Sequence, residues 1–261
     1  GPITAPRVPG SDAAGVIVEL GPGVEGWQVG DEVVVSAPGG TYATHVAVPV
    51  DSLTRKPSAL GWAQAAGIGI PAGTAYQALR SLGVESGMTV LIHAASGAVG
   101  QAAVQFAREL GARVIGTAGP ANHDRVRQLG AIPVTYGEGL VERVRAISPA
   151  GVDRALDGAG TDEAIEASLE LTGDPQHVAT IVRGADAPKW GIQAYKGGSL
   201  LPLTAEQEEL RAEGVRLAAE RAASGVFDVE IARTLRLDDA AQAQRMLEDG
   251  TAPRGKIILL P

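Results

Sequence analysis

The stretch TVLIHAASGAVGQAAVQFARELGARVIGT, residues 89–117, decides the fold. It places a glycine-rich turn between a short apolar run at 89–94 and a longer run with one apolar face at 99–110. A second apolar run, typical of a strand, follows at 113–117. Strand, tight turn, helix and second strand make up the βαβ unit of a dinucleotide-binding fold. The stretch therefore predicts a parallel sheet covered by helices.

Small residues occupy the turn in the pattern Ala95-x-Gly97-x-x-Gly100. In a dinucleotide fold the first permits the tight turn, the second lets the backbone approach a pyrophosphate, and the third lets helix and strand pack closely. The anion then lies at the helix N-terminus, which free N–H groups and the helix dipole make favourable. The alternative is a tight turn without a ligand. The residues predicted to hold the cofactor here are Ala95, Ser96, Gly97, Ala98, Val99 and Gly100.

The segment after the second strand indicates which nicotinamide cofactor fits. An acidic residue at this strand end would bind a free ribose 2′-hydroxyl, but position 117 is Thr. Thr117, Asn122, His123 and Arg125 offer donors suited to a phosphate, which favours NADPH over NADH, although Asp124 weakens the argument. The alternative is that Asn122 and Arg125 only cap and solvate the next helix.

Helix-like and strand-like runs continue to alternate after this unit, which favours parallel βαβ units. The first seventy residues instead read as short strands separated by Gly and Pro, which suggests a barrel-like sheet. Predicted strands are 15–20, 32–35, 133–136, 155–157, 177–181, 229–234 and 256–260, and predicted helices are 75–82, 140–147, 162–171, 205–224 and 238–247.

Composition narrows the classes of function. The chain has 261 residues and a formal charge of −8, with its basic residues scattered, so nucleic acid is not an expected partner. No cysteine is present, which removes disulfides, thiolate metal sites and a cysteine nucleophile. No apolar run is long enough for a membrane span, and no signal sequence opens the chain, so we expect no membrane partner and a cytoplasmic location.

Several ordered motifs together resemble one family. They are VPGSDAAGVIVELGPGVEGWQVGDEVV (8–34), GGTYATHVAV (39–48), AGTAYQAL (72–79), HAASGAVG (93–100) and GKIILLP (255–261). With these motifs the chain resembles the zinc-independent medium-chain dehydrogenases/reductases, specifically their quinone oxidoreductase and enoyl reductase branch. The resemblance covers nearly the whole chain.

The resemblance implies an α/β fold with two domains. A Rossmann doubly wound parallel sheet that binds NADP(H) would span 73–203, and a GroES-like β-rich catalytic domain would span 1–72 and 204–261. Family members usually begin some fifty or sixty residues earlier, so this catalytic domain is expected to lack its N-terminal strands. The family often forms homodimers through an edge strand, which matches 198–203 here.

The resemblance also bears on metal. Zinc-dependent relatives read G-H-E-x-x-G, with the His as a ligand, where this chain reads Gly10-Ser11-Asp12-Ala13-Ala14-Gly15. With Ser11 in place of that His and no cysteine, no metal site is expected.

The reaction that the resemblance implies is hydride transfer from NADPH to a quinone or α,β-unsaturated carbonyl compound, a small electrophilic substrate. Thr74 would lie near the nicotinamide, and Gly116, Thr117 and Tyr136 around the adenosine phosphate. His123 stands where a family lysine is common. Asp157 and Gly158 match a loop beside the adenine ribose, or a helix N-cap turn. Lys256 matches a lysine near the cleft, or a solvated residue that opens a strand.

Tyr42 is the phenol of the β-rich segment. It either donates a proton and lines the substrate cleft or only packs. Two alternatives to a quinone or enone reductase stay open: an enoyl reductase acting on carrier-bound thioesters in polyketide biosynthesis, and a non-catalytic NADP(H)-binding sensor or structural protein.

Overall fold

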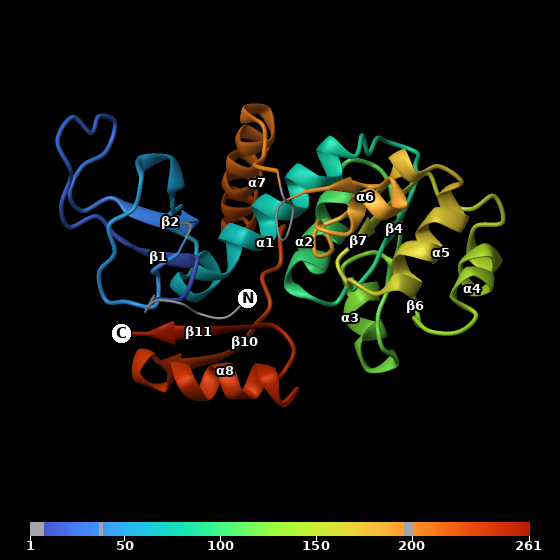
Figure 1. Cartoon of the computed structure of the whole chain (residues 1–261). Coiled ribbons are helices and arrows are strands. Elements are labelled where there is room, and N and C mark those ends of the chain that lie inside the picture. The colour runs from blue at the N-terminus through green and yellow to red at the C-terminus, as the bar shows by residue number, and fades with distance from the viewer. Residues whose placement is uncertain (1–7, 37–38, 196–200) are drawn as a thin grey trace. The chain divides into compact units, whose positions relative to one another are not determined.

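The computed structural model describes residues 8–36, 39–195 and 201–261 (Figure 1). The chain divides into two compact units, the first made of residues 1–70 and 215–261 and the second of residues 71–214. The division falls within helix α1 (Trp62–Ser81) and helix α7 (Ala205–Ala223). The functional assignment of the domains remains a prediction.

A six-stranded parallel sheet forms the centre of the second unit, in the order β6-β5-β4-β7-β8-β9. Numbered along the unit, this is the order 3-2-1-4-5-6 of a Rossmann fold, which confirms the predicted fold class. The strands are β4 (Thr89–Ile92), β5 (Arg113–Thr117), β6 (Ile132–Val134), β7 (Arg154–Asp157), β8 (Val178–Thr180) and β9 (Gln193–Ala194).

Helices cover both faces of this sheet (Figure 1). Leu91 and Ile115 pack into a buried apolar cluster with residues of α4 and α5. Gly116, the next residue of β5, faces the other way: a Cβ there would lie 3.1 Å from Val126 of α3. The helices are α2 (Ala98–Glu109), α3 (His123–Gln128), α4 (Leu140–Ile147), α5 (Asp162–Thr172) and α6 (Ala187–Trp190).

The first unit contains two sheets. β1 (Asp12–Val16), β2 (Glu32–Ser36) and β3 (Leu53–Arg55) form an antiparallel sheet, with Ile17, Val33 and Val35 at the centre of a small apolar cluster. β10 (Ile231–Arg236) and β11 (Lys256–Leu260) pair in parallel, and α8 (Ala240–Glu248) connects them. In the part of the chain that is described, the barrel-like sheet suggested by strand spacing is not closed. Short 3-10 helices occupy Val50–Ser52, Pro120–Asn122, Pro175–His177 and Leu237–Asp239.

Helix α1 corrects the prediction for residues 62–74. The sequence predicted a helix only over 75–82, and the segment before it contains Gly67, Gly69 and Pro71, which are weak helix formers. In the structure these glycines serve close packing instead: a Cβ on Gly69 would lie 2.6 Å from the Asp12 Oδ1 atom, and one on Gly67 3.0 Å from Val229. Tertiary packing therefore overrides the weak helix propensity of this segment.

Two further predictions concern strand 198–203 and the membrane. Residues 198–200 lie outside the described residues, and 201–203 form no strand, so the homodimer remains a prediction. Among the described helices, none is long and apolar enough to cross a membrane.

Candidate functional site

The N-terminus of α2 presents an open set of N–H groups at the glycine-rich turn. Gly97 is the N-cap, in extended backbone, and contributes no side-chain hydrogen bond. Gly97 and Ala98 are exposed, whereas Ala95 and Gly100 are buried. The first N–H groups of a helix have no partner within the helix, and the helix dipole adds partial positive charge there. The turn therefore offers the features of an anion site.

The buried glycine of the turn has a packing role. A Cβ on Gly100 would clash with the Ala94 carbonyl oxygen and lie 2.8 Å from the Ala95 Cα atom. A Cβ on Gly97 would meet only the Ala94 carbonyl oxygen, at 3.3 Å. Gly97 is therefore the position where the backbone is open to a ligand, and Gly100 the position where helix and strand touch.

Three predicted residues gather on the loops beyond β5 and β6. The Asn122 N–H donates to the Gly119 carbonyl (2.8 Å), and the His123 Nε2 atom lies 3.2 Å from the Ala118 carbonyl oxygen. The Tyr136 side chain is exposed, and a Cβ on Gly119 would lie 3.6 Å from its hydroxyl oxygen. The Asn122 N–H, the His123 ring and the Tyr136 hydroxyl thus lie near the segment 118–119, and their shared role in binding a phosphate stays a prediction.

Arg143 holds the loop that carries Tyr136. Its guanidinium donates to the carbonyl oxygens of Thr135, Gly137 and Glu138, at 2.7 to 3.1 Å. On the same loop the Gly137 N–H donates to the Glu163 carboxylate at 2.7 Å. Backbone carbonyls fixed by one guanidinium leave the loop little freedom, so Tyr136 projects from a rigid support.

Two predicted phosphate donors face inward instead. The Arg125 side chain is buried, and its Nε and Nη2 atoms both donate to the Gln101 Oε1 atom, at 2.8 and 2.6 Å. Thr117 is also buried, and its hydroxyl contacts the Ala94 N–H and His93. The suggestion that Arg125 solvates the next helix is therefore wrong, because this guanidinium ties α3 to α2.

Asp157 organises the loop after β7. The carboxylate is fully buried, accepts hydrogen bonds from the Ala159 and Gly160 N–H groups (both 2.9 Å) and accepts one from the Thr180 hydroxyl (2.7 Å). The N-cap of the following helix is Thr161, so Asp157 is not that cap. A Cβ on Gly158 would lie 3.2 Å from the His93 carbonyl oxygen, which brings this loop beside the glycine-rich turn.

Thr74 has a partner that the sequence did not reveal. Its buried hydroxyl accepts a hydrogen bond from the Nη1 atom of Arg211 on α7 (2.9 Å), and Arg211 is itself buried, with Glu208 at 3.7 Å. The polar pattern of α7 predicts solvated charges, so no sequence signal separates Arg211 from its neighbours.

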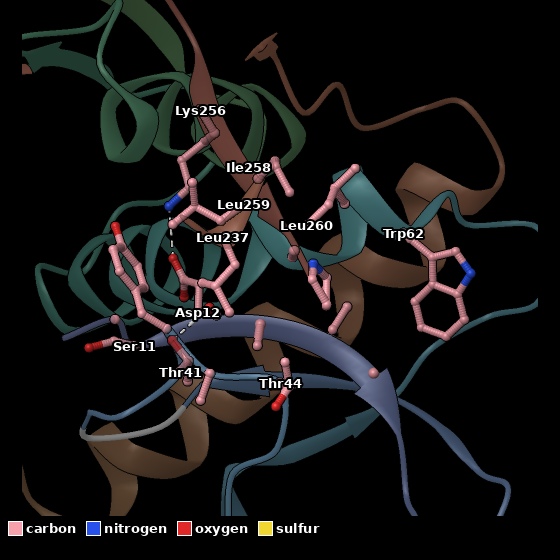
Figure 2. A pocket seen from close by; sticks show the side chains of 18 of the residues that line it. Ser11, Asp12, Thr41, Thr44, Trp62, Leu237, Lys256, Ile258, Leu259 and Leu260 are labelled. Atoms are coloured by element: carbon pink, nitrogen blue, oxygen red, sulfur yellow. Dashed lines mark hydrogen bonds and ion pairs between the residues drawn. The ribbon is translucent and has the colours of Figure 1, made fainter. Parts of the chain in front are cut away.

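The first unit contains a pocket of about 610 Å³ (Figure 2). It is lined by consecutive residues of β1 and β11, together with Thr41, Tyr42, Trp62 and Leu237. The Lys256 Nζ atom lies 2.8 Å from the Asp12 Oδ2 atom. The other oxygen of Asp12 accepts a hydrogen bond from the Ile70 N–H at 2.6 Å. Lys256 is therefore neither a fully solvated residue nor an unpartnered one.

Tyr42 lines the same pocket and is half-buried. Its hydroxyl oxygen accepts a hydrogen bond from the Gln244 Nε2 atom of α8 at 3.1 Å. A hydroxyl that accepts in this way keeps its own proton for donation. Tyr42 therefore lines the pocket and is held there by Gln244, and its role as a proton donor stays a prediction.

Comparisons with known proteins agree with this architecture. The model of the zinc-binding dehydrogenase family matches residues 129–259, which is 131 of the 261 residues, and that of the alcohol dehydrogenase GroES-like domain matches 1–58. The chain is 39% identical over 171 residues to the polyketide synthase GfsB of Streptomyces halstedii, covering 64% of this chain and 3% of that protein. It is 42% identical over 123 residues to human quinone oxidoreductase, covering 46% of this chain and 37% of that protein.

A solved structure extends the likeness. The quinone oxidoreductase of Escherichia coli, determined in complex with NADPH, superposes with a TM-score of 0.84 at 28% identity, over 100% of this chain and 84% of that one. The match to the curated relatives covers less than half of their length. The chain belongs to the medium-chain dehydrogenase/reductase family, in the branch that contains quinone oxidoreductases, and the resemblance drawn from its motifs is confirmed.

The name of the matching family model raises the question of zinc. Structural and catalytic zinc sites need three or four Cys, His or carboxylate ligands. The chain has no cysteine, and within the described ranges no three His, Asp or Glu side chains are grouped closely enough to hold a metal ion. The described residues therefore do not fit a zinc site.

Proposed function

We propose that the protein is an NADPH-dependent oxidoreductase that reduces a quinone or an α,β-unsaturated carbonyl compound. The observation that carries the proposal is the uncapped, exposed N-terminus of α2 at Gly97, beside a turn whose backbone is open at that position. This is where a dinucleotide pyrophosphate binds in a Rossmann fold. The NADPH complex of the Escherichia coli enzyme supports the choice of cofactor.

The loops after β5 and β6 support NADPH over NADH. Asn122, His123 and Tyr136 lie near the segment 118–119, and we assign them to the 2′-phosphate of the adenosine. Arg125 and the Thr117 hydroxyl drop out of that assignment because both face inward. We assign Gly116 and the Asp157–Gly158 loop to the walls of the cofactor site, where their backbone atoms would face the cofactor. Thr74, whose hydroxyl accepts a hydrogen bond from Arg211, is assigned to the nicotinamide end.

Bound NADPH would supply a hydride to an electrophilic carbon of the substrate. The chain's own residues orient the two molecules, exclude water and supply a proton to the developing oxyanion. We assign the proton to the Tyr42 hydroxyl, whose oxygen accepts a hydrogen bond from Gln244, and the ammonium group of Lys256 is a second candidate donor in the same pocket.

Consumption of NADPH in the presence of simple quinones and enones tests the proposal. We expect oxidation with at least one acceptor, faster with NADPH than with NADH, and unchanged after treatment with a chelator. The Tyr42→Phe variant should lose at least about 10-fold in kcat while binding NADPH normally. Tight NADPH binding without oxidation by any acceptor would instead favour a non-catalytic sensor or structural protein.

The polyketide synthase relative supports a second candidate, an enoyl reductase acting on carrier-bound thioesters. The two activities differ in the acceptor. An enoyl thioester of pantetheine, with and without its carrier protein, separates them: the second candidate predicts a much higher kcat/KM for the carrier-bound thioester than for any free quinone.

A further inference from the structure

Ala94, at the start of the glycine-rich turn, has left-handed backbone with φ of +55°. Among the described residues other than glycine, it alone has positive φ. A residue with a Cβ adopts this conformation at a cost, and such residues persist where their surroundings hold them in place. The contacts of Ala94 must therefore hold its backbone in this conformation.

The contacts of Ala94 connect it to the rest of the turn. Its carbonyl oxygen accepts a hydrogen bond from the Gly97 N–H at 2.9 Å and lies against Gly100. The next N–H, that of Ala95, donates to the Thr117 carbonyl at 2.9 Å. The orientation of the Ala94 peptide thus sets the positions of both glycines.

A chain of buried side chains ends at the Ala94 N–H. The Ser168 hydroxyl donates to the Ala164 carbonyl (2.7 Å), so its oxygen accepts from the His93 Nε2 atom (3.0 Å). The Nε2 atom then carries the ring proton and the Nδ1 atom is an acceptor. The Thr117 hydroxyl lies 3.3 Å from this Nδ1 atom and donates to it, while its oxygen accepts from the Ala94 N–H at 3.2 Å.

In this hydrogen-bond network, one assignment of donors and acceptors satisfies every group. A neutral imidazole is required, and burial lowers the pKa of His93 to about 4, although Asp157 and Glu163 oppose the shift. His93 directly follows β4, Thr117 is the last residue of β5, and Ser168 lies in α5, so the network joins three elements beneath the turn.

We propose that His93, Thr117 and Ser168 are positioning residues that hold Ala94 in its left-handed conformation and so preorganise the glycine-rich turn for the dinucleotide. The inference rests on the proposed function, since it names how that site is built. It also replaces the predicted direct contact of the Thr117 hydroxyl with the cofactor by an indirect role.

The test compares three variants in NADPH binding, measured by calorimetry. Thr117→Val removes the hydroxyl at nearly constant volume, and we expect the Kd for NADPH to rise about 10-fold or more. Thr117→Ser keeps the hydroxyl and should bind as the wild type does. Adding Ala94→Gly to Thr117→Val should restore most of the affinity, because glycine adopts positive φ without the network.

A control and a measurement without cofactor keep the test decisive. Ser148→Ala removes another buried hydroxyl of the same unit, which donates to the Gly151 carbonyl, and should lower the Tm without changing the Kd.

Hydrogen exchange of residues 93–100 without NADPH should be faster in Thr117→Val than in the wild type. Wild-type NADPH affinity in Thr117→Val, failure of Ala94→Gly to restore a lost affinity, or unchanged exchange would overturn the inference. A wild-type protein that does not bind NADPH would end the proposed function, while the exchange result would still decide what holds Ala94.

Discussion

His93 brings an ionisable ring into the interior of the second unit, and its chemistry makes stability depend on pH. Burial lowers its pKa from 6.5 to about 4. As pH falls below about 6.5, the unfolded chain takes up this proton while the folded chain does not, so stability decreases until the folded-state pKa is reached. Above pH 7 the group is neutral in both states and its contribution is constant.

We therefore expect His93 to account for a loss of about 2 kcal/mol in the free energy of unfolding between pH 7 and pH 5. Urea unfolding of the wild type and of His93→Gln at both pH values measures it. The variant starts less stable at pH 7 but should lose about 2 kcal/mol less over this interval. An equal pH dependence in both proteins would show that the pKa of His93 is not lowered in the folded state.

At the scale of single residues, the sequence predicted the turn well and the partners poorly. The small residues 95, 97 and 100 are recognisable because the constraint acts on their own backbone. The inward direction of Thr117 and Arg125 was not predictable, since it depends on Gln101 and on the His93 network, which come from other elements. Arg211 and Gln244 were missed for the same reason: each acts on a residue more than a hundred positions away.

At the scale of elements, α2 separates the packing role of a glycine from its binding role. An aspartate at position 100 would clash with the Ala94 backbone and disturb the turn, so it could not separate a loss of binding from a loss of packing. An aspartate at position 97 would not cause such a clash, because Gly97 is the exposed N-cap and has extended backbone. Aspartate and asparagine are both favourable N-cap residues.

Gly97→Asp should therefore leave the Tm within a few degrees of the wild type while it raises the Kd for NADPH about 100-fold. Gly97→Asn is the matched control, with nearly the same volume and no charge, and should raise the Kd about 10-fold or less. Calorimetric binding and thermal unfolding of both variants give the comparison. Equal affinities for the two variants would argue against an anion at this helix terminus.

Element boundaries were predictable where a segment has its own periodicity and stop signals. Strand 113–117, helix 140–147 and strand 256–260 have the predicted bounds. Helix α1 shows the opposite case, because its first half contains two glycines and a proline and takes its structure from contacts with β1 and with residues near 230. Information of that kind lies in the tertiary structure and not in the local sequence.

At the scale of the whole molecule, the two compact units can be followed separately by tryptophan fluorescence. Trp27 and Trp62 belong to the first unit, where Arg55 and Lys56 lie over their rings, and Trp190 belongs to the second. The turn, Gly119 and Tyr136 all lie in the second unit. A ligand that binds only the folded state stabilises the unit that holds its site.

The variant Trp27→Phe/Trp62→Phe leaves Trp190 as the reporter of the second unit, and Trp190→Phe leaves the other two as reporters of the first. At 100 times its Kd, NADPH should stabilise the folded second unit by about 2.7 kcal/mol and raise the Trp190 midpoint by roughly 5 to 10 °C. The midpoint reported by Trp27 and Trp62 should rise by less if the units unfold separately, and by the same amount if they unfold together. A rise in the first unit without one in the second would place the cofactor's main contacts outside the Rossmann fold, because linkage stabilises the unit that makes the contacts.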